Sequence, residues 1–221
     1  MVRGIFIAGN DSALSRAIEA ETEKRVECFA SALIQNRLTG APKNTAPENE
    51  KRVTLDWNPS SPISARTLVL AAENRLEHID EAILVCSPPS IRASAADLSL
   101  ADVEIMVNDH IKGWFFLVKE LAVVFKNRKR GTLTLVYSDI TNTVKDDTAD
   151  ILGPSALAFF RALTHGLLSA AHNDPYFTAG FSVSDTGNEA AFASFMYKTI
   201  DEINKRSNGK LHKFGKFSFF K

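Results

Sequence analysis

A turn near the start of the chain is the first place where residue types and spacing suggest chemistry. The apolar run 4–8 breaks at Gly9, and an apolar helical face headed by Leu14 follows, which predicts a strand, a tight turn and a helix. Backbone N–H groups and the positive end of a helix dipole converge on such a turn, so it could hold the pyrophosphate of a dinucleotide. Alternatively, Asp11 or Ser12 only caps the helix. The turn alone leaves both interpretations open.

The other reactive side chains do not form a recognisable set. Cys28 and Cys86 each lie inside an apolar run and outside any metal-ligand spacing, so both are expected to be small buried hydrophobic residues. His165 lies on an apolar helical stretch, where a hydrogen-bonded packing role is expected. We therefore predict no metal site.

Composition narrows the class of protein. The 221 residues are 45% hydrophobic, and 26 basic side chains balance 26 acidic ones. Without a net charge there is no overall field to recruit nucleic acid or an anionic membrane, and neither is expected as a partner. No secretory signal pattern and no apolar run of membrane-spanning length is seen, so we expect a cytoplasmic protein.

Strand and helix patterns alternate along the chain. Strands are expected at 4–8, 26–30, 52–57, 79–86, 131–138, 176–181 and 210–220, and helices after the first turn and at 32–37, 64–77, 100–127, 155–171 and 190–205. This alternation predicts an α/β fold, a doubly wound and mostly parallel sheet of about seven strands in a Rossmann-like three-layer sandwich. We expect a single domain over residues 1–221, with an irregular loop at about 38–52.

Two of the expected helices carry more apolar surface than one sheet face can cover. Residues 100–127 and 155–171 are apolar on two sides, with aromatic side chains such as Trp114, Phe116 and Phe160 among them. A second surface of each helix is therefore expected to be buried, most simply against another subunit. The sequence predicts a homo-oligomer formed through these helices.

Several stretches together resemble the short-chain dehydrogenase/reductase family along nearly the whole chain. In the first half of the chain they are 8–15, in the place of Thr-Gly-x-x-x-Gly-x-Gly; 55–57, which resembles the Asp that ends the third strand; and 84–89, in the place of Asn-Asn-Ala-Gly. In the second half they are 110–113, which resembles Asn-x-x-Gly; 133–138, which resembles the strand ending in the catalytic Ser; and 153–168, which resembles the helix of Tyr-x-x-x-Lys. The resemblance implies the same α/β fold.

The resemblance also implies a catalytic set, which this chain only partly retains. Ser138 corresponds to the Ser that positions a carbonyl, and His110 stands where the family has an Asn. The family's Tyr and Lys exchange a proton while nicotinamide exchanges a hydride. Those two positions align with Gly153 and Leu157, which cannot transfer a proton. The candidates for relocated catalytic groups are Tyr137 beside Ser138, His110, and Lys145 on the loop that follows.

By the same resemblance the cofactor would be NAD or NADP. The residues that would contact it are Gly9, Ser12 and Leu14 in the first turn, Asp56 and Trp57 after the third strand, and Cys86 at the end of the fourth. Ala13 and Ser15 replace two family glycines and narrow the approach to a pyrophosphate. Asp11 adds a carboxylate that repels one.

Two functional hypotheses follow. In the first, the chain has lost the standard oxidoreductase chemistry and serves as an oligomeric binding or scaffolding protein. In the second, it is a divergent NAD(P)-dependent short-chain oxidoreductase that acts on a small carbonyl or alcohol with relocated catalytic groups. A fold resemblance cannot choose between them, and the small-molecule substrate is not indicated by the sequence.

Overall fold

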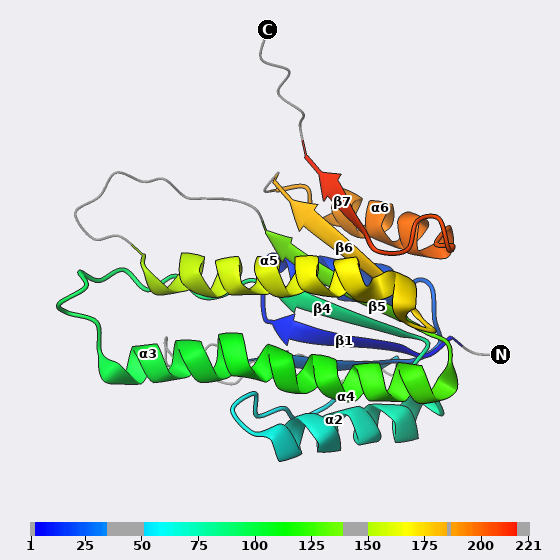
Figure 1. Ribbon diagram of the computed structural model, residues 1–221, viewed down its shortest axis with the longest axis horizontal. Coiled ribbons are helices and arrows are strands. Elements are labelled where there is room, and N and C mark those ends of the chain that lie inside the picture. The colour runs from blue at the N-terminus through cyan, green and yellow to red at the C-terminus, as the bar shows by residue number, and fades with distance from the viewer. Residues whose placement is uncertain (1–2, 35–50, 139–149, 185–186, 216–221) are drawn as a thin grey trace, which may run out of the picture.

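A parallel β-sheet forms the centre of the molecule (Figure 1). The computed structural model describes residues 3–34, 51–138, 150–184 and 187–215. Within these ranges the sheet has seven strands in the order β3-β2-β1-β4-β5-β6-β7, all paired in parallel. The strands are β1 (Ile5–Asn10), β2 (Phe29–Ile34), β3 (Arg52–Thr54), β4 (Glu81–Cys86), β5 (Thr132–Ser138), β6 (Phe177–Val183) and β7 (Lys210–Phe214). The predicted doubly wound α/β fold is confirmed.

Helices cover both faces of the sheet. They are α1 (Ala13–Thr22), α2 (Pro62–Leu76), α3 (Leu100–Val107), α4 (Gly113–Arg128), α5 (Leu152–Ala170) and α6 (Glu189–Asp201), with a short 3₁₀ turn, η3 (Ala171–Asn173), after α5. Helices α2, α4 and α5 pack on one face through residues such as Leu68, Leu117 and Phe160. Helices α1 and α6 pack on the other through Ile18 and Met196. Figure 1 shows α4 and α5 side by side across the front of the sheet.

The central strand β1 is buried throughout. Phe6 and Ala8 join the core under α2, α4 and α5, whereas Ile5 and Ile7 join the core under α1 and α6. Side chains alternate between the two faces of a strand, and both faces of this sheet are covered. This is why β1 is a continuous apolar run.

Serine side chains start three of the helices. Ser12 Oγ accepts the N–H of Ser15, Ser61 Oγ that of Ser64, and Ser99 Oγ that of Asp102. Each bond satisfies one of the N–H groups that a helix start leaves unpaired.

The second strand lies later in the chain than predicted. A strand at 26–30 and a helical piece at 32–37 were expected, but Ala32 to Ile34 belong to β2, and residues 35–37 lie outside the described ranges. Strand β2 pairs with β1 along its whole length on one side, and its first half pairs with β3 on the other. Those ladders and the burial of Ala30 and Ala32 outweigh the weak helical preference of the sequence.

The predicted helix at 100–127 is interrupted. Its two halves, α3 and α4, are joined by a π-helical turn, η2 (Asn108–Lys112). Asp109 and His110 are buried in this turn. An extra residue per turn rotates side chains about the helix axis and often marks a functional position.

Other boundaries shift at strand ends. The third strand ends at Thr54 and not at Trp57, and among the described residues it pairs with β2 alone. The last strand ends at Phe214. Most of the irregular loop predicted at 38–52 and the end of the predicted strand at 210–220 fall outside the described residues. Among the residues described, no helix is long and apolar enough to cross a membrane.

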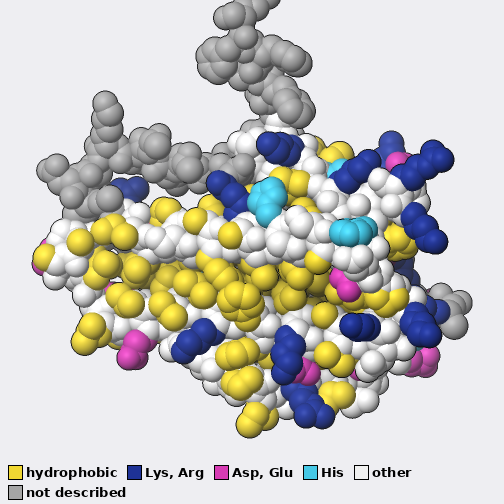
Figure 2. Space-filling model, viewed as in Figure 1, with side chains coloured by type: hydrophobic (Ala, Val, Ile, Leu, Met, Phe, Trp, Pro, Cys, Tyr) yellow, Lys and Arg dark blue, Asp and Glu magenta, His cyan; other side chains and the backbone are white. Residues whose placement is uncertain are grey.

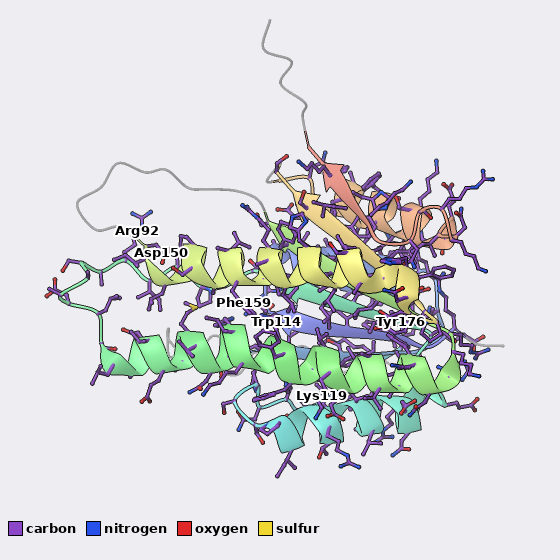
Figure 3. All side chains as sticks on the ribbon, in the orientation of Figure 1. Arg92, Trp114, Lys119, Asp150, Phe159 and Tyr176 are labelled. Atoms are coloured by element: carbon purple, nitrogen blue, oxygen red, sulfur yellow. The ribbon has the colours of Figure 1, made fainter. Side chains whose placement is uncertain are left out.

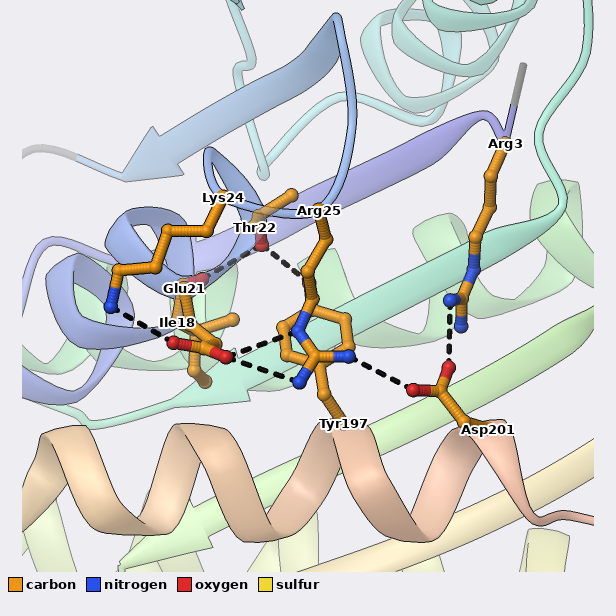
Figure 4. A network of polar contacts seen from close by, with 8 residues as sticks. All are labelled: Arg3, Ile18, Glu21, Thr22, Lys24, Arg25, Tyr197 and Asp201. Carbon is orange, nitrogen blue, oxygen red and sulfur yellow. Dashed lines mark hydrogen bonds and ion pairs between the residues drawn. The ribbon is translucent and has the colours of Figure 1, made fainter.

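An ionic network joins α1, α6 and the starts of the central strands (Figure 4). Asp201 pairs with Arg3 at 2.7 Å and with Arg25 at 2.9 Å. Arg3 also binds the buried Glu81 at the start of β4, and the Arg25 guanidinium lies 4.7 Å from the ring centroid of Tyr197. The network lies at the amino ends of the strands, away from the turn discussed above.

Candidate functional site

The candidate site lies at the carboxyl ends of the central strands. From β1 the chain builds the sheet outward in one direction through β2 and β3, and in the other through β4 to β7. Ligands of open α/β sheets bind in the crevice where this direction reverses, which here lies between β1 and β4. The first turn, the end of β4 and η2 meet at this point.

Hydroxyl groups fill the turn between β1 and α1. Ser12 Oγ accepts the Ser15 N–H at 3.2 Å, and the Ser15 hydroxyl donates to the carbonyl of Asn10 at 2.5 Å. Asp11 donates its N–H to Ile34 on β2. The capping role predicted as one possibility for Ser12 is confirmed.

The charged side chains of this turn are paired with each other. The Arg16 guanidinium donates to both carboxylate oxygens of Asp11, at 2.8 and 3.0 Å. The hydrogen bond to Asp11 raises the pKa of Arg16 above its usual value. The carboxylate is thereby held at the mouth of the turn.

Gly9 and Leu14 have structural tasks in this turn. A Cβ on Gly9 would lie 2.2 Å from the carbonyl oxygen of Val85 on β4, so only glycine allows the two strands to approach as they do. The Leu14 side chain is buried in the core under α1. The cofactor contacts predicted for Gly9 and Leu14 stay predictions.

A buried amide connects three elements at the centre of the crevice. Asn10 Oδ1 accepts the N–H of Ser87 at 2.9 Å, and its Nδ2 lies 3.1 Å from Nδ1 of His110. Because Nδ2 can only donate, Nδ1 must accept, and the proton of the neutral ring resides on Nε2. Burial lowers the pKa of His110 to about 4, so the ring is neutral above that pH.

Tyr137 and Ser138 point to different surroundings. The Tyr137 ring is buried against Phe160, with ring centroids 6.4 Å apart, and the Arg161 guanidinium lies 5.8 Å from its centroid. Ser138, the last residue of β5, is half-buried, and adjacent residues of a strand face opposite sides. The catalytic roles predicted for Tyr137, Ser138 and His110 stay predictions, and Lys145 lies outside the described residues.

The start of α5 lies directly on the loop that follows β4. Asp150 Oδ1 accepts the N–H of Gly153 at 2.9 Å, and a Cβ on Gly153 would lie 2.5 Å from Asp150 Oδ2 and 3.0 Å from the carbonyl of Pro89. An isolated antiparallel bridge joins Arg92 to Asp150, and Figure 3 shows these two residues at the same end of α5. A tyrosine therefore does not fit at position 153 without displacing this loop.

The remaining predicted residues lie around the crevice in separate settings. Asp56 is exposed beyond the end of β3, whereas the half-buried Trp57 packs edge to face on Trp114 with centroids 5.7 Å apart. Cys86 ends β4 fully buried, and burial raises the pKa of its thiol, so it stays protonated. Leu157 packs against the core under α5.

Sequence reasoning missed Asn10 and Asp150. Asn10 is the one polar side chain in an otherwise apolar run that forms β1, and it ends that run. A buried polar residue at the carboxyl end of a central strand is the signal that could have identified it. For Asp150, the bond from the Gly153 N–H three positions later is a local signal of a helix start, whereas the bridge to Arg92 joins positions far apart in the sequence and has no such signal.

Metal ligands are not gathered in the described ranges. No group of three or more His, Cys, Asp or Glu side chains there could hold a metal ion. The sequence predicted no metal site anywhere in the chain, and that stays a prediction because some residues lie outside the described ranges.

The strand order, the parallel pairing and the placement of the helices define the fold of the short-chain dehydrogenases/reductases. Levodione reductase is similar over 96% of this chain and 95% of its own, with a TM-score of 0.72 and 13% identity. A short-chain dehydrogenase from Bacillus anthracis is similar over 96% and 94%, with a TM-score of 0.73 and 12% identity. A short-chain dehydrogenase/reductase from Serratia marcescens is similar over 96% of this chain and 95% of its own, with a TM-score of 0.66 and 15% identity.

No protein-family model and no curated protein matches the sequence. At the identities of the similar structures, the likeness establishes the fold and leaves the function to be argued from the residues of the site.

Proposed function

We propose that this protein has kept the short-chain dehydrogenase/reductase fold, has lost its standard oxidoreductase chemistry, and acts as an oligomeric binding or scaffolding protein. The observation that carries the proposal is the packing of Gly153. The position that resembles the catalytic Tyr holds a glycine wedged between the Asp150 carboxylate and the Pro89 carbonyl. The position that resembles the Lys holds Leu157, packed against the core.

An apolar surface on α4 and α5 supports the binding role. Phe115 is 52% exposed and Val123 is 48% exposed, and both lie on α4. Phe115 meets Phe159 of α5 edge to face, with centroids 5.0 Å apart. Figure 2 shows hydrophobic side chains in a continuous band over these two helices. Contiguous apolar surface of this kind is typical of an interface.

A second copy of the chain is the proposed occupant of this surface. Helices α4 and α5 run parallel to each other on one face, and they can pack on the same two helices of another subunit across a two-fold axis, which makes the contact self-complementary. The expectation of a homo-oligomer through residues 100–127 and 155–171 rests on this geometry.

Light scattering coupled to size exclusion tests the proposal. Wild-type protein at micromolar concentration is expected to be a dimer or larger. Phe115→Glu places a charge at the centre of the surface and should weaken association about 30-fold, the effect of losing ~2 kcal/mol at a hot spot. Leu70→Glu is the matched control, since Leu70 on α2 is 50% exposed and lies outside the α4 and α5 surface.

A monomeric wild-type protein would contradict the oligomeric part of the proposal. Equal weakening by Phe115→Glu and Leu70→Glu would show that the interface lies elsewhere.

The divergent reductase is the second candidate, and the position of Ser138 favours it. Ser138 is half-buried at the carboxyl end of β5, where a substrate carbonyl could be oriented. If a carbonyl reductase activity is found, Ser138→Ala should lower it, and unchanged turnover in that variant would remove this candidate.

A further inference from the structure

The crevice at the carboxyl ends of β1 and β4 is where this fold would hold a dinucleotide. Such a cofactor needs free backbone N–H groups and open space at the first turn for its diphosphate, and a continuous crevice from there toward α5. The described residues can be compared with both requirements.

The first turn does not fit a diphosphate. The N–H of Ser15 is bound by Ser12 Oγ, and the Ser15 hydroxyl is turned inward to the carbonyl of Asn10. The Asp11 carboxylate is fixed at the mouth of the turn by Arg16. A bound diphosphate would meet this negative charge, and the Nε and Nη2 groups of the neighbouring guanidinium are already bound to the Asp11 carboxylate.

The middle of the crevice is occupied by the Asn10 amide. Its oxygen and nitrogen are both used, one by Ser87 at the end of β4 and the other by His110 in η2. Asn10 is 5% exposed and His110 is 3% exposed. These side chains tie β1, β4 and η2 together across the place where a ligand would separate them.

The end toward α5 is fastened as well. The bridge between Arg92 and Asp150 joins the segment after β4 to the start of α5. Gly153 packs closely on the same loop, since a Cβ there would lie 3.0 Å from the Pro89 carbonyl oxygen.

We infer that the crevice is closed by the chain's own residues and excludes a dinucleotide at both ends, first by the side chains of the β1–α1 turn and then by the fastening of α5 to the β4 loop. The inference goes beyond the proposed function, because a protein without the catalytic pair could still bind NAD or NADP. It does not depend on self-association.

Titration calorimetry with ADP and NADH distinguishes the obstacle at the β1–α1 turn from the obstacle at the start of α5. ADP carries the diphosphate and the adenosine alone, so it probes the turn, whereas NADH must also extend toward α5. Wild-type protein is expected to bind neither ligand at millimolar concentration. The double variant Asp11→Ser/Ser15→Gly opens the turn and is expected to gain at least ~10-fold in affinity for ADP. It should bind NADH no more tightly than ADP, since the α5 end stays fastened.

Three results would overturn the inference. Saturable micromolar binding of NADH or NADPH by the wild type would show an open crevice. No gain of ADP binding in the double variant would show that the turn's side chains are not the obstacle. Much tighter binding of NADH than of ADP by that variant would show that the α5 end is open.

Folding of the variant is checked by thermal unfolding before titration. If the double variant does not fold, ADP and NADH binding are compared between the wild type and the single variant Asp11→Ser, which removes only an exposed ion pair. Arg16→Ala is the matched control, because it removes the pair but leaves the carboxylate, and it should gain no ADP binding. Neither result bears on the light-scattering test, so failure of this inference and failure of the proposed function remain distinguishable.

Discussion

The buried side chain of His110 holds the Asn10 amide in place, and the ring nitrogen that makes this contact is not available for proton transfer. Its Nδ1 is committed to Asn10, and burial keeps the ring neutral over the range in which histidines usually titrate. A protonated ring would present a donor to the Asn10 amide N–H₂, and turning that amide around would break the bond from Ser87. The junction is therefore stable only with a neutral ring.

This arrangement predicts a pH dependence of folding. The ordinary pKa of 6.5 falls to about 4 in the folded state, so the contribution is complete above pH 6.5 and is lost as the pH falls toward 4. The free energy of unfolding should decrease by about 3 kcal/mol over that interval from this residue. Urea unfolding measured at several pH values tests this, with His110→Gln as the variant that lacks the titration. The same slope in both proteins would show that His110 is not the cause.

Two glycines provide a matched pair for the packing at the switch point. A Cβ on Gly9 meets the Val85 carbonyl at 2.2 Å, whereas a Cβ on Gly166 in α5 meets nothing within 4 Å. Gly9→Ala should destabilise the protein by about 2–3 kcal/mol, because the contact is with backbone that cannot move aside. Gly166→Ala should stabilise it by about 0.5–1 kcal/mol through helix propensity. Thermal unfolding of both variants checks the pair, and a mild effect at Gly9 would mean that β1 and β4 can separate.

At the scale of elements, strands with continuous apolar runs were predictable and marginal ones were not. The strands β1, β4 and β5 lie where their patterns indicated, because burial on both faces leaves an unambiguous sequence. The β2 strand was misplaced, since its second half resembles a helix until its partners are known. The π-helical turn η2 has no signal of its own in the apolar spacing.

The candidate site was predictable only in its location. A glycine at the end of the first strand indicated the turn, but what fills that turn depends on contacts between distant segments. Asn10 with His110, and Arg92 with Asp150, come together only in the folded chain. Sequence spacing indicates which reactive groups a site could contain, whereas side-chain packing in the folded chain decides whether a ligand can enter that site.

The docking of α6 gives a prediction at the same scale. Asp201, at the end of this helix, pairs with both Arg3 and Arg25. Asp201→Asn should lower the free energy of unfolding by about 1 kcal/mol and raise hydrogen exchange at the end of α6, because partly exposed ion pairs contribute modestly. Glu202→Gln, one position along, is the control for the change of charge. Equal effects of the two variants would attribute the loss to net charge alone.

The whole molecule presents two contrasting regions. The carboxyl edge of the sheet is fastened by polar contacts of its own, whereas the face made by α4 and α5 leaves Phe115 and Val123 exposed. A fold retained for catalysis would be expected to keep this edge open to a ligand. The proposal that the function lies on this surface rests on the exposed apolar side chains and on the packing of Gly153.

The ionic network at the amino ends of the strands also bears on how the chain folds during synthesis. Arg3 and Asp201 are separated by 198 positions, so their contact forms only after nearly the whole chain has been made. A nascent chain that has reached β5 already contains Arg3, Arg25 and Glu81 but lacks the carboxylate that joins the two arginines. The first part of the sheet must then be stabilised by its apolar core, and the ion pairs of Asp201 with Arg3 and Arg25 form last, when α6 packs on the sheet.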